Sequence, residues 1–161
     1  MDFFALIGKY FWLMIIGVAV ANYFLADRFG DSSAGEGVDG ALRRKYLGWF
    51  WGLSIVPWLV MGYGQVVGGV PNVWALFRPQ DRNPHVWAVY ASILAVYAIV
   101  VYWVLFRDGA RIAAELRLLK YQAPGKSGAL SAFWIKVMAI GAFPFFALWL
   151  WIASQMNVPI P

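Results

Sequence analysis

Four residues between positions 78 and 85 have side chains that could carry out chemistry. This stretch contains the only histidine of the 161-residue chain, close after a carboxylate and two guanidinium groups. A histidine beside a carboxylate can transfer a proton near neutral pH, and guanidinium groups hold anions. The candidates for such an anion-binding or interface site are Arg78, Asp81, Arg82 and His85.

The same stretch has the features of a helix that begins at a membrane surface. Asn83 can cap a helix, Pro84 suits its first turn, and Trp87 prefers the level of the lipid headgroups. In this interpretation Asp81 and Arg82 form a solvated pair. We prefer it, and we expect an apolar helix to begin near residue 86. The segment before it, VWALF, is too apolar for a free loop, so we expect it to lie at the interface or against a neighbour.

The remainder of the chain offers little catalytic chemistry. It has no cysteine and a single histidine, which argues against thiolate metal sites and a doubly histidine-ligated haem. No carboxylate lies deep in an apolar stretch. We therefore predict no metal ligand, no catalytic residue and no cofactor held within this chain, and an enzyme is the less favoured class. Tyr90 and Tyr97, seven residues apart, either bond to backbone groups or line a cavity for a quinone or another ring-shaped ligand.

Composition identifies the class of protein that must position these residues. Hydrophobic residues make up 62% of the chain and charged residues 13%, far from the balance of soluble domains. Four stretches are long enough to cross a hydrocarbon core of about 30 Å: residues 3–26, 46–66, 86–106 and 133–154. We predict an all-α integral membrane protein, a single domain over residues 1–161 with four transmembrane helices, of which the first is retained and not cleaved as a signal peptide.

The positive charges indicate how such a protein would be oriented. Ten of the 13 lysines and arginines lie in or beside the connections 27–45 and 107–132. The positive-inside rule places these connections in the cytoplasm and both termini outside it. For a bacterium, this predicts a multi-pass protein of the inner membrane with periplasmic termini. Because the basic residues lie beside apolar stretches, nucleic acid is not an expected partner.

The stretch after the third span is basic and amphipathic. Ile112, Leu116 and Leu119 share one side of a helix, which we expect to bend at Gly109 and to continue until the Pro124-Gly125 pair. Its basic residues could dock anionic lipid or a partner protein on the cytoplasmic side. They are Arg111, Arg117 and Lys120.

Small residues predict where helices approach closely. Gly48 and Gly52 are four apart in the second span, and the third span carries an alanine face. In lipid, such faces let helix backbones come together. The alanine face consists of Ala91, Ala95 and Ala98, and we expect it to meet another helix.

These features leave three functional hypotheses. The first, which we favour, is a non-catalytic accessory or assembly subunit of a larger membrane complex, respiratory or photosynthetic, with other transmembrane subunits and membrane lipids as partners and with lipid, quinone or pigment at a subunit interface. The second is a small oligomeric transporter or channel, motivated by proline kinks at Pro57 and Pro144. The third is a membrane enzyme whose site lies at the periplasmic interface between Arg78 and His85.

Overall fold

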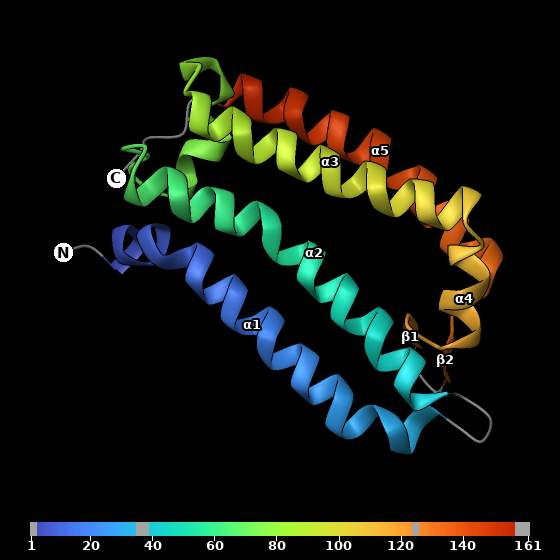
Figure 1. The fold of residues 1–161 in the computed structure, drawn as a ribbon. Helices are drawn as coiled ribbons and strands as arrows, with labels where there is room; N and C mark the ends of the chain where they lie inside the picture. Colours follow the sequence, from blue (N-terminus) through green and yellow to red (C-terminus); the bar gives the residue numbers. More distant parts are fainter. Residues whose placement is uncertain (1–2, 35–38, 124–125, 157–161) are drawn as a thin grey trace.

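The structure of the protein is a computed structural model that describes residues 3–34, 39–123 and 126–156. Five α-helices dominate this part of the chain, together with two short 3-10 helices and one antiparallel hairpin (Figure 1). In chain order the elements are α1 (Phe3–Ala34), α2 (Gly40–Val66), η1 (Val73–Phe77), η2 (Pro79–Asp81), α3 (Pro84–Phe106), α4 (Gly109–Glu115), β1 (Lys120–Ala123), β2 (Lys126–Ala129) and α5 (Ala132–Gln155).

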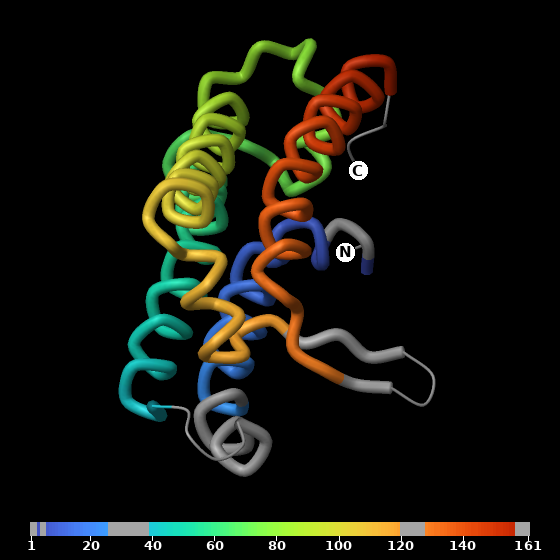
Figure 2. Tube along the Cα trace, turned by 90° about the vertical axis from the view of Figure 1, so that its right-hand side faces the viewer, coloured from blue at the N-terminus to red at the C-terminus, as the bar shows by residue number. Residues whose placement is uncertain are grey.

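The long helices pack in the order in which they occur in the chain. α1 contacts α2, α2 contacts α3, and α3 contacts α5. Residues 67–83, which we call the connecting segment, lie at the same end of the molecule as both termini, whereas α4 and the hairpin lie at the opposite end (Figure 1). Figure 2 shows the connecting segment crossing this end, where η1 and η2 contact α5. Successive long helices therefore run in opposite directions between the two ends of the molecule.

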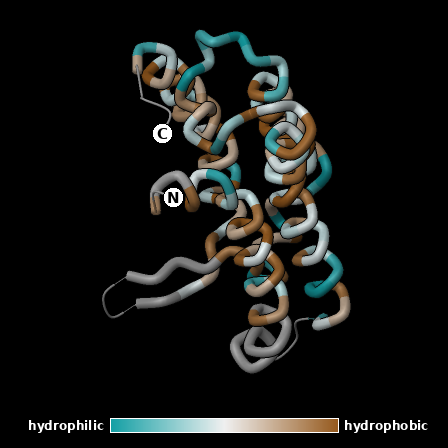
Figure 3. The backbone as a smooth tube through the Cα atoms, turned by 90° about the vertical axis from the view of Figure 1, so that its left-hand side faces the viewer, coloured by the Kyte–Doolittle hydropathy of each residue, from teal (hydrophilic) through white to brown (hydrophobic). Residues whose placement is uncertain are grey.

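Three of the described helices are long and apolar enough to cross a membrane. They comprise Leu6–Leu25 within α1, all of α3 and all of α5. Figure 3 shows hydrophobic residues along these helices and hydrophilic residues mainly toward the ends of the molecule. α2 corresponds to the second predicted span, but it carries three basic residues, Arg43, Arg44 and Lys45, near its start and several glycines along its length. A crossing by α2 stays a prediction.

The predicted polar connection over residues 27–45 is wrong for most of its length. α1 continues to Ala34 and α2 already begins at Gly40, while residues 35–38 lie outside the described part of the chain. At about 1.5 Å per residue, the 32-residue α1 is about 48 Å long and extends beyond a hydrocarbon core of about 30 Å. Asp39 starts α2, because its carboxylate accepts hydrogen bonds from the backbone N–H groups of Ala41 and Leu42 at 2.9 and 3.1 Å.

The expected amphipathic helix after the third span is only partly present. The bend at Gly109 is confirmed, since α3 ends at Phe106 and Asp108 has a positive φ of 56°. The predicted continuation until the Pro124-Gly125 pair is wrong: α4 ends at Glu115, Arg117 has a φ of 49°, and a hairpin follows. In the hairpin β1 pairs with β2 from Lys120 opposite Ala129 to Ala123 opposite Lys126.

The buried residues form two clusters at opposite ends of the molecule. The cluster at the termini includes Met61, Val86 and Tyr90 together with Val73 and Leu76 of the connecting segment. The second cluster joins α4 to its neighbours and consists of Val104, Ala110, Ala113 and Ile135. α4 thus packs its apolar side on α3 and α5. Between the clusters the helices expose large apolar side chains, as expected for surfaces in lipid.

Candidate functional site

The connecting segment positions most of the predicted site residues. Val73 and Leu76 are 6% exposed, so η1 is buried against the helices as its apolar sequence predicts. Asn72 caps η1, because its Oδ1 accepts a hydrogen bond from the backbone N–H of Trp74 at 3.0 Å. The hydroxyl of Tyr90 in α3 donates a hydrogen bond to the carbonyl of Leu76. η1 is therefore held by two side chains, that of Asn72 at its start and that of Tyr90 from α3.

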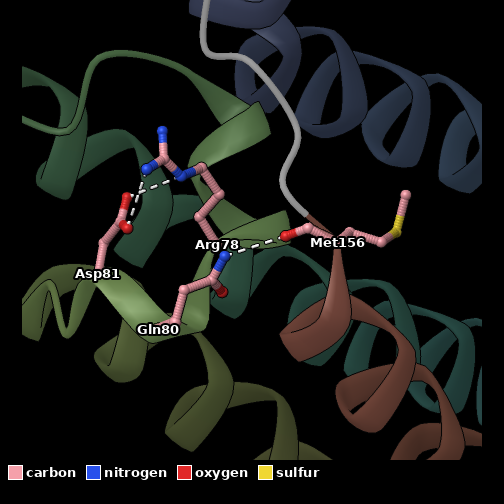
Figure 4. A network of polar contacts seen from close by, with 4 residues as sticks. All are labelled: Arg78, Gln80, Asp81 and Met156. Carbon is pink, nitrogen blue, oxygen red and sulfur yellow. Dashed lines mark hydrogen bonds and ion pairs between the residues drawn. The ribbon is translucent and has the colours of Figure 1, made fainter.

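Arg78 and Asp81 form a two-point ion pair across η2. The Arg78 Nε lies 3.0 Å from Oδ2 of Asp81, and its Nη2 donates to Oδ1 at 3.1 Å (Figure 4). Beside this pair, the Gln80 Nε2 donates to the carbonyl of Met156 at 3.0 Å and ties η2 to the end of α5 (Figure 4). The Asp81 carboxylate thus neutralises Arg78.

Arg82 follows Asp81 in the chain but takes no part in this ion pair. Its backbone has a φ of 53°, a left-handed conformation that is uncommon outside glycine, and its side chain is exposed. Together with Arg78, Asp81 and Asn83, Arg82 lines a hollow of about 280 Å³. Three of the four predicted residues therefore come together, and their net charge is that of one cation.

The side chain of His85 packs between the start of α3 and the end of α2. It lies against Gly64 of α2 and Gly68 of the connecting segment: an added Cβ would lie 3.1 Å from the His85 Cβ at Gly64 and 2.3 Å from Cδ2 at Gly68. The backbone N–H of His85 donates to Oδ1 of Asn83 at 2.9 Å, and Pro84 is the first residue of α3. The predicted helix start is confirmed, and His85 is not among the residues that line the hollow.

Tyr90 and Tyr97 of α3 both bond to backbone carbonyls. Tyr90 is 1% exposed and bonds to Leu76, whereas the Tyr97 hydroxyl donates to the carbonyl of Ala139 in α5. Tyr97 therefore links α3 to α5. Both hydroxyls therefore have a hydrogen-bond partner inside the protein.

The predicted packing residues differ in what covers them. Gly48 lies against the ring of Tyr23 in α1, because an added Cβ would be 3.5 Å from Cε2, whereas nothing lies within 4 Å of such an atom at Gly52. Both glycines line an apolar groove of about 370 Å³ between α1 and α2. The alanine face of α3, formed by Ala91, Ala95 and Ala98, is exposed.

The closest glycine contacts of α1 were not predicted from the sequence. The ring of Trp12 lies on Gly62 of α2, where an added Cβ would be 2.6 Å from Cε3. The ring of Trp74 in η1 lies on Gly8, where the same test gives 2.6 Å to Nε1. No sequence pattern predicts which tryptophan will contact a glycine far away in the chain, so these contacts are known only from the structure.

The basic residues of the opposite end are partly engaged with acidic neighbours. Arg111 lies 3.9 Å from Asp108 and 3.8 Å from Glu115, all with largely exposed side chains. Arg117 is exposed, and the side chain of Lys120 lies outside the described residues. The described residues contain no group of three or more histidine, cysteine, aspartate or glutamate side chains that could hold a metal ion.

Replacing Asp81 with asparagine tests the ion pair of η2. Both partners are about a third exposed, so we expect the free energy of unfolding to fall by only about 0.5–1 kcal/mol. Thermal unfolding in detergent measures this change. Glu115→Asn, which removes a carboxylate 3.8 Å from Arg111, is the control with the same charge change. A fall of several kcal/mol for Asp81→Asn alone would contradict this modest role.

Comparisons with protein-family models, with curated proteins and with solved structures find no match for this chain.

Proposed function

We propose that this chain is a non-catalytic accessory or assembly subunit of a larger bacterial membrane protein complex. The observation that carries the proposal is the exposed alanine face of α3. The proposal includes a neighbouring transmembrane helix from another subunit that packs on this face, and a lipid, quinone or pigment can occupy space at the same boundary.

The alanine face has the spacing of a helix-packing surface. Its residues Ala91, Ala95 and Ala98 are preceded by Ala88, so small residues recur after three, four and three positions, and all four are exposed. This is the repeat by which two helices pack along a shared seam. Leu94 is 39% exposed beside the seam and can flank a partner helix.

The contrast with α5 supports a protein partner over lipid at this face. The exposed side of α5 carries large apolar residues, such as Phe145 and Leu148, which are 74% and 50% exposed. Large side chains fill the space against mobile lipid chains. Small residues are instead enriched where two helix backbones approach each other, because hydrophobic burial provides no driving force there.

The membrane orientation belongs to the same proposal. α1, α2, α3 and α5 would all cross the inner membrane, with the hairpin end in the cytoplasm and both termini in the periplasm. The proposal is supported by the gathering of α4, the hairpin, the end of α1 and the start of α2 at one end (Figure 1), since these segments carry most of the lysines and arginines.

The enzyme hypothesis receives less support from the geometry. Arg78 is neutralised by Asp81, and His85 packs on Gly68. A proton-transfer site would need the imidazole beside the carboxylate.

Replacing Ala95 with tryptophan tests the proposed subunit contact. A bulky ring in the middle of the seam should hold the partner backbone away, and we expect recovery of the co-purifying subunit from native membranes to fall at least about tenfold. The matched control is Ala147→Trp, at an exposed alanine of α5. The measurement is quantitative mass spectrometry after affinity purification in mild detergent.

The absence of cysteine from the chain allows a second readout. Ala95→Cys with a short thiol-reactive photocrosslinker should give one covalent product with the partner subunit, whereas Ala147→Cys should give none. Recovery of the protein as a lone chain, without a crosslinked product at Ala95→Cys, would refute the proposal.

A further inference from the structure

We infer that a hollow between η2, the start of α3 and the end of α5 binds an anionic phospholipid, with the phosphate at Arg82 and an acyl chain beside Trp87 and Leu150. This hollow is not the one lined by Arg78 and Asp81, although Arg82 lines both, and it too has a volume of about 280 Å³. It is lined by Pro79, Gln80, Arg82, Trp87, Leu150 and Ser154. The inference rests on the membrane location proposed above, but it requires no partner subunit.

Arg82 provides the charge that a phosphate needs. Arg78 is already paired with Asp81 at 3.0 Å, whereas no ion pair or hydrogen bond of the Arg82 side chain occurs within the described ranges. Its guanidinium group offers five N–H donors in a planar arrangement that matches the oxygens of a phosphate. The exposed cation of this hollow is therefore available to a ligand.

The other polar side chains of the hollow are already used. Gln80 Nε2 donates to the carbonyl of Met156 at 3.0 Å, and Ser154 Oγ donates to the carbonyl of Trp151 at 2.7 Å. The first bond ties η2 to the end of α5, and the second lies within α5. They leave Arg82 as the group that would select the charge of a ligand.

The apolar side of the hollow favours a lipid over a water-soluble anion. Trp87 is 48% exposed, and Leu150 faces the same hollow from α5. Both helices are apolar and long enough to span a membrane, and the hollow lies at the end where α3 begins and α5 ends. A phospholipid places its phosphate at this level and its chain along the apolar helices.

Native mass spectrometry of the purified full-length chain in detergent tests the inference. The protein is titrated with phosphatidylglycerol or with phosphatidylcholine of the same acyl chains. We expect preferential binding of phosphatidylglycerol. Arg82→Asn should lower its affinity about tenfold while leaving phosphatidylcholine unchanged, because a charge-assisted contact is lost. Asparagine also tolerates the left-handed backbone of this position.

Two further variants separate charge from shape. Arg82→Lys keeps the charge but loses the planar donor group, so it should retain more of the affinity than Arg82→Asn and less than the unchanged protein. Leu150→Trp should lower the affinity by filling the apolar side. The matched control is Arg107→Asn, which removes the same charge from an exposed arginine at the opposite end. Equal phosphatidylglycerol binding by Arg82→Asn and Arg107→Asn would overturn the inference.

A competition experiment distinguishes a lipid from a free anion. Inorganic phosphate and glycerol phosphate should not displace phosphatidylglycerol at concentrations comparable with the lipid. Displacement at such concentrations would show a site for soluble phosphate and would overturn the lipid assignment. Because these measurements use the isolated chain and the subunit test uses the alanine face, either proposal can fail without the other.

Discussion

Tyr90→Ala is expected to destabilise the protein more than truncation of any other tyrosine in α3, lowering the free energy of unfolding by about 3–5 kcal/mol. The Tyr90 side chain is 1% exposed, and its hydroxyl donates to the carbonyl of Leu76. Its ring also meets the ring of Trp149 edge to face, with centroids 5.7 Å apart. Truncation would leave a cavity between α3, η1 and α5 and an unsatisfied buried carbonyl.

Two control variants show whether the loss comes from this contact. Tyr102→Ala truncates a tyrosine of the same helix that is 55% exposed, so we expect a loss below about 1 kcal/mol. Tyr90→Phe keeps the ring and should cost about 1–3 kcal/mol through the unpaired carbonyl. Unfolding in mixed micelles measures stability, and hydrogen exchange of residues 73–78 reports on the release of η1. Equal losses at Tyr90 and Tyr102 would contradict the assigned role.

Short-range sequence patterns predicted several of the elements around the candidate site of Arg78, Asp81 and Arg82. Asn83 and Pro84 marked the start of α3, and Gly109 marked the bend after it, because capping, proline geometry and close packing act within a few residues. The apolar sequence of η1 also predicted its burial. Each of these properties depends on neighbours in the chain, so each can be found from the chain alone.

Tertiary contacts decided the features that the sequence did not predict. α4 packs its apolar side with Val104 and Ile135 and ends at Glu115, and the chain then turns back as a hairpin. Likewise, the proximity of Arg78, Asp81 and Arg82 follows from spacing, but the direction of His85 depends on its packing against Gly64 and Gly68. The residue types in this stretch do not show that the His85 imidazole packs on Gly68 and not beside the Asp81 carboxylate.

Gly62→Val should disrupt the contact between α1 and α2, with a fall of about 3 kcal/mol in the free energy of unfolding. Even a single Cβ at Gly62 would lie 2.6 to 2.8 Å from three atoms of the Trp12 ring, closer than real contacts allow. The ring is rigid and packs against the buried cluster at the termini, so it cannot move aside cheaply. Thermal unfolding in detergent, followed by circular dichroism, measures the effect.

The matched control for this substitution is another glycine of α2. Nothing lies within 4 Å of a Cβ added at Gly52, so Gly52→Val should change stability by less than about 1 kcal/mol. A double-variant cycle then isolates the steric term: Trp12→Leu combined with Gly62→Val should cost clearly less than the sum of the two single changes, because the smaller side chain makes room for valine. Additive losses would mean that Trp12 is not what excludes a side chain at position 62, and the close approach of α1 and α2 would need another explanation.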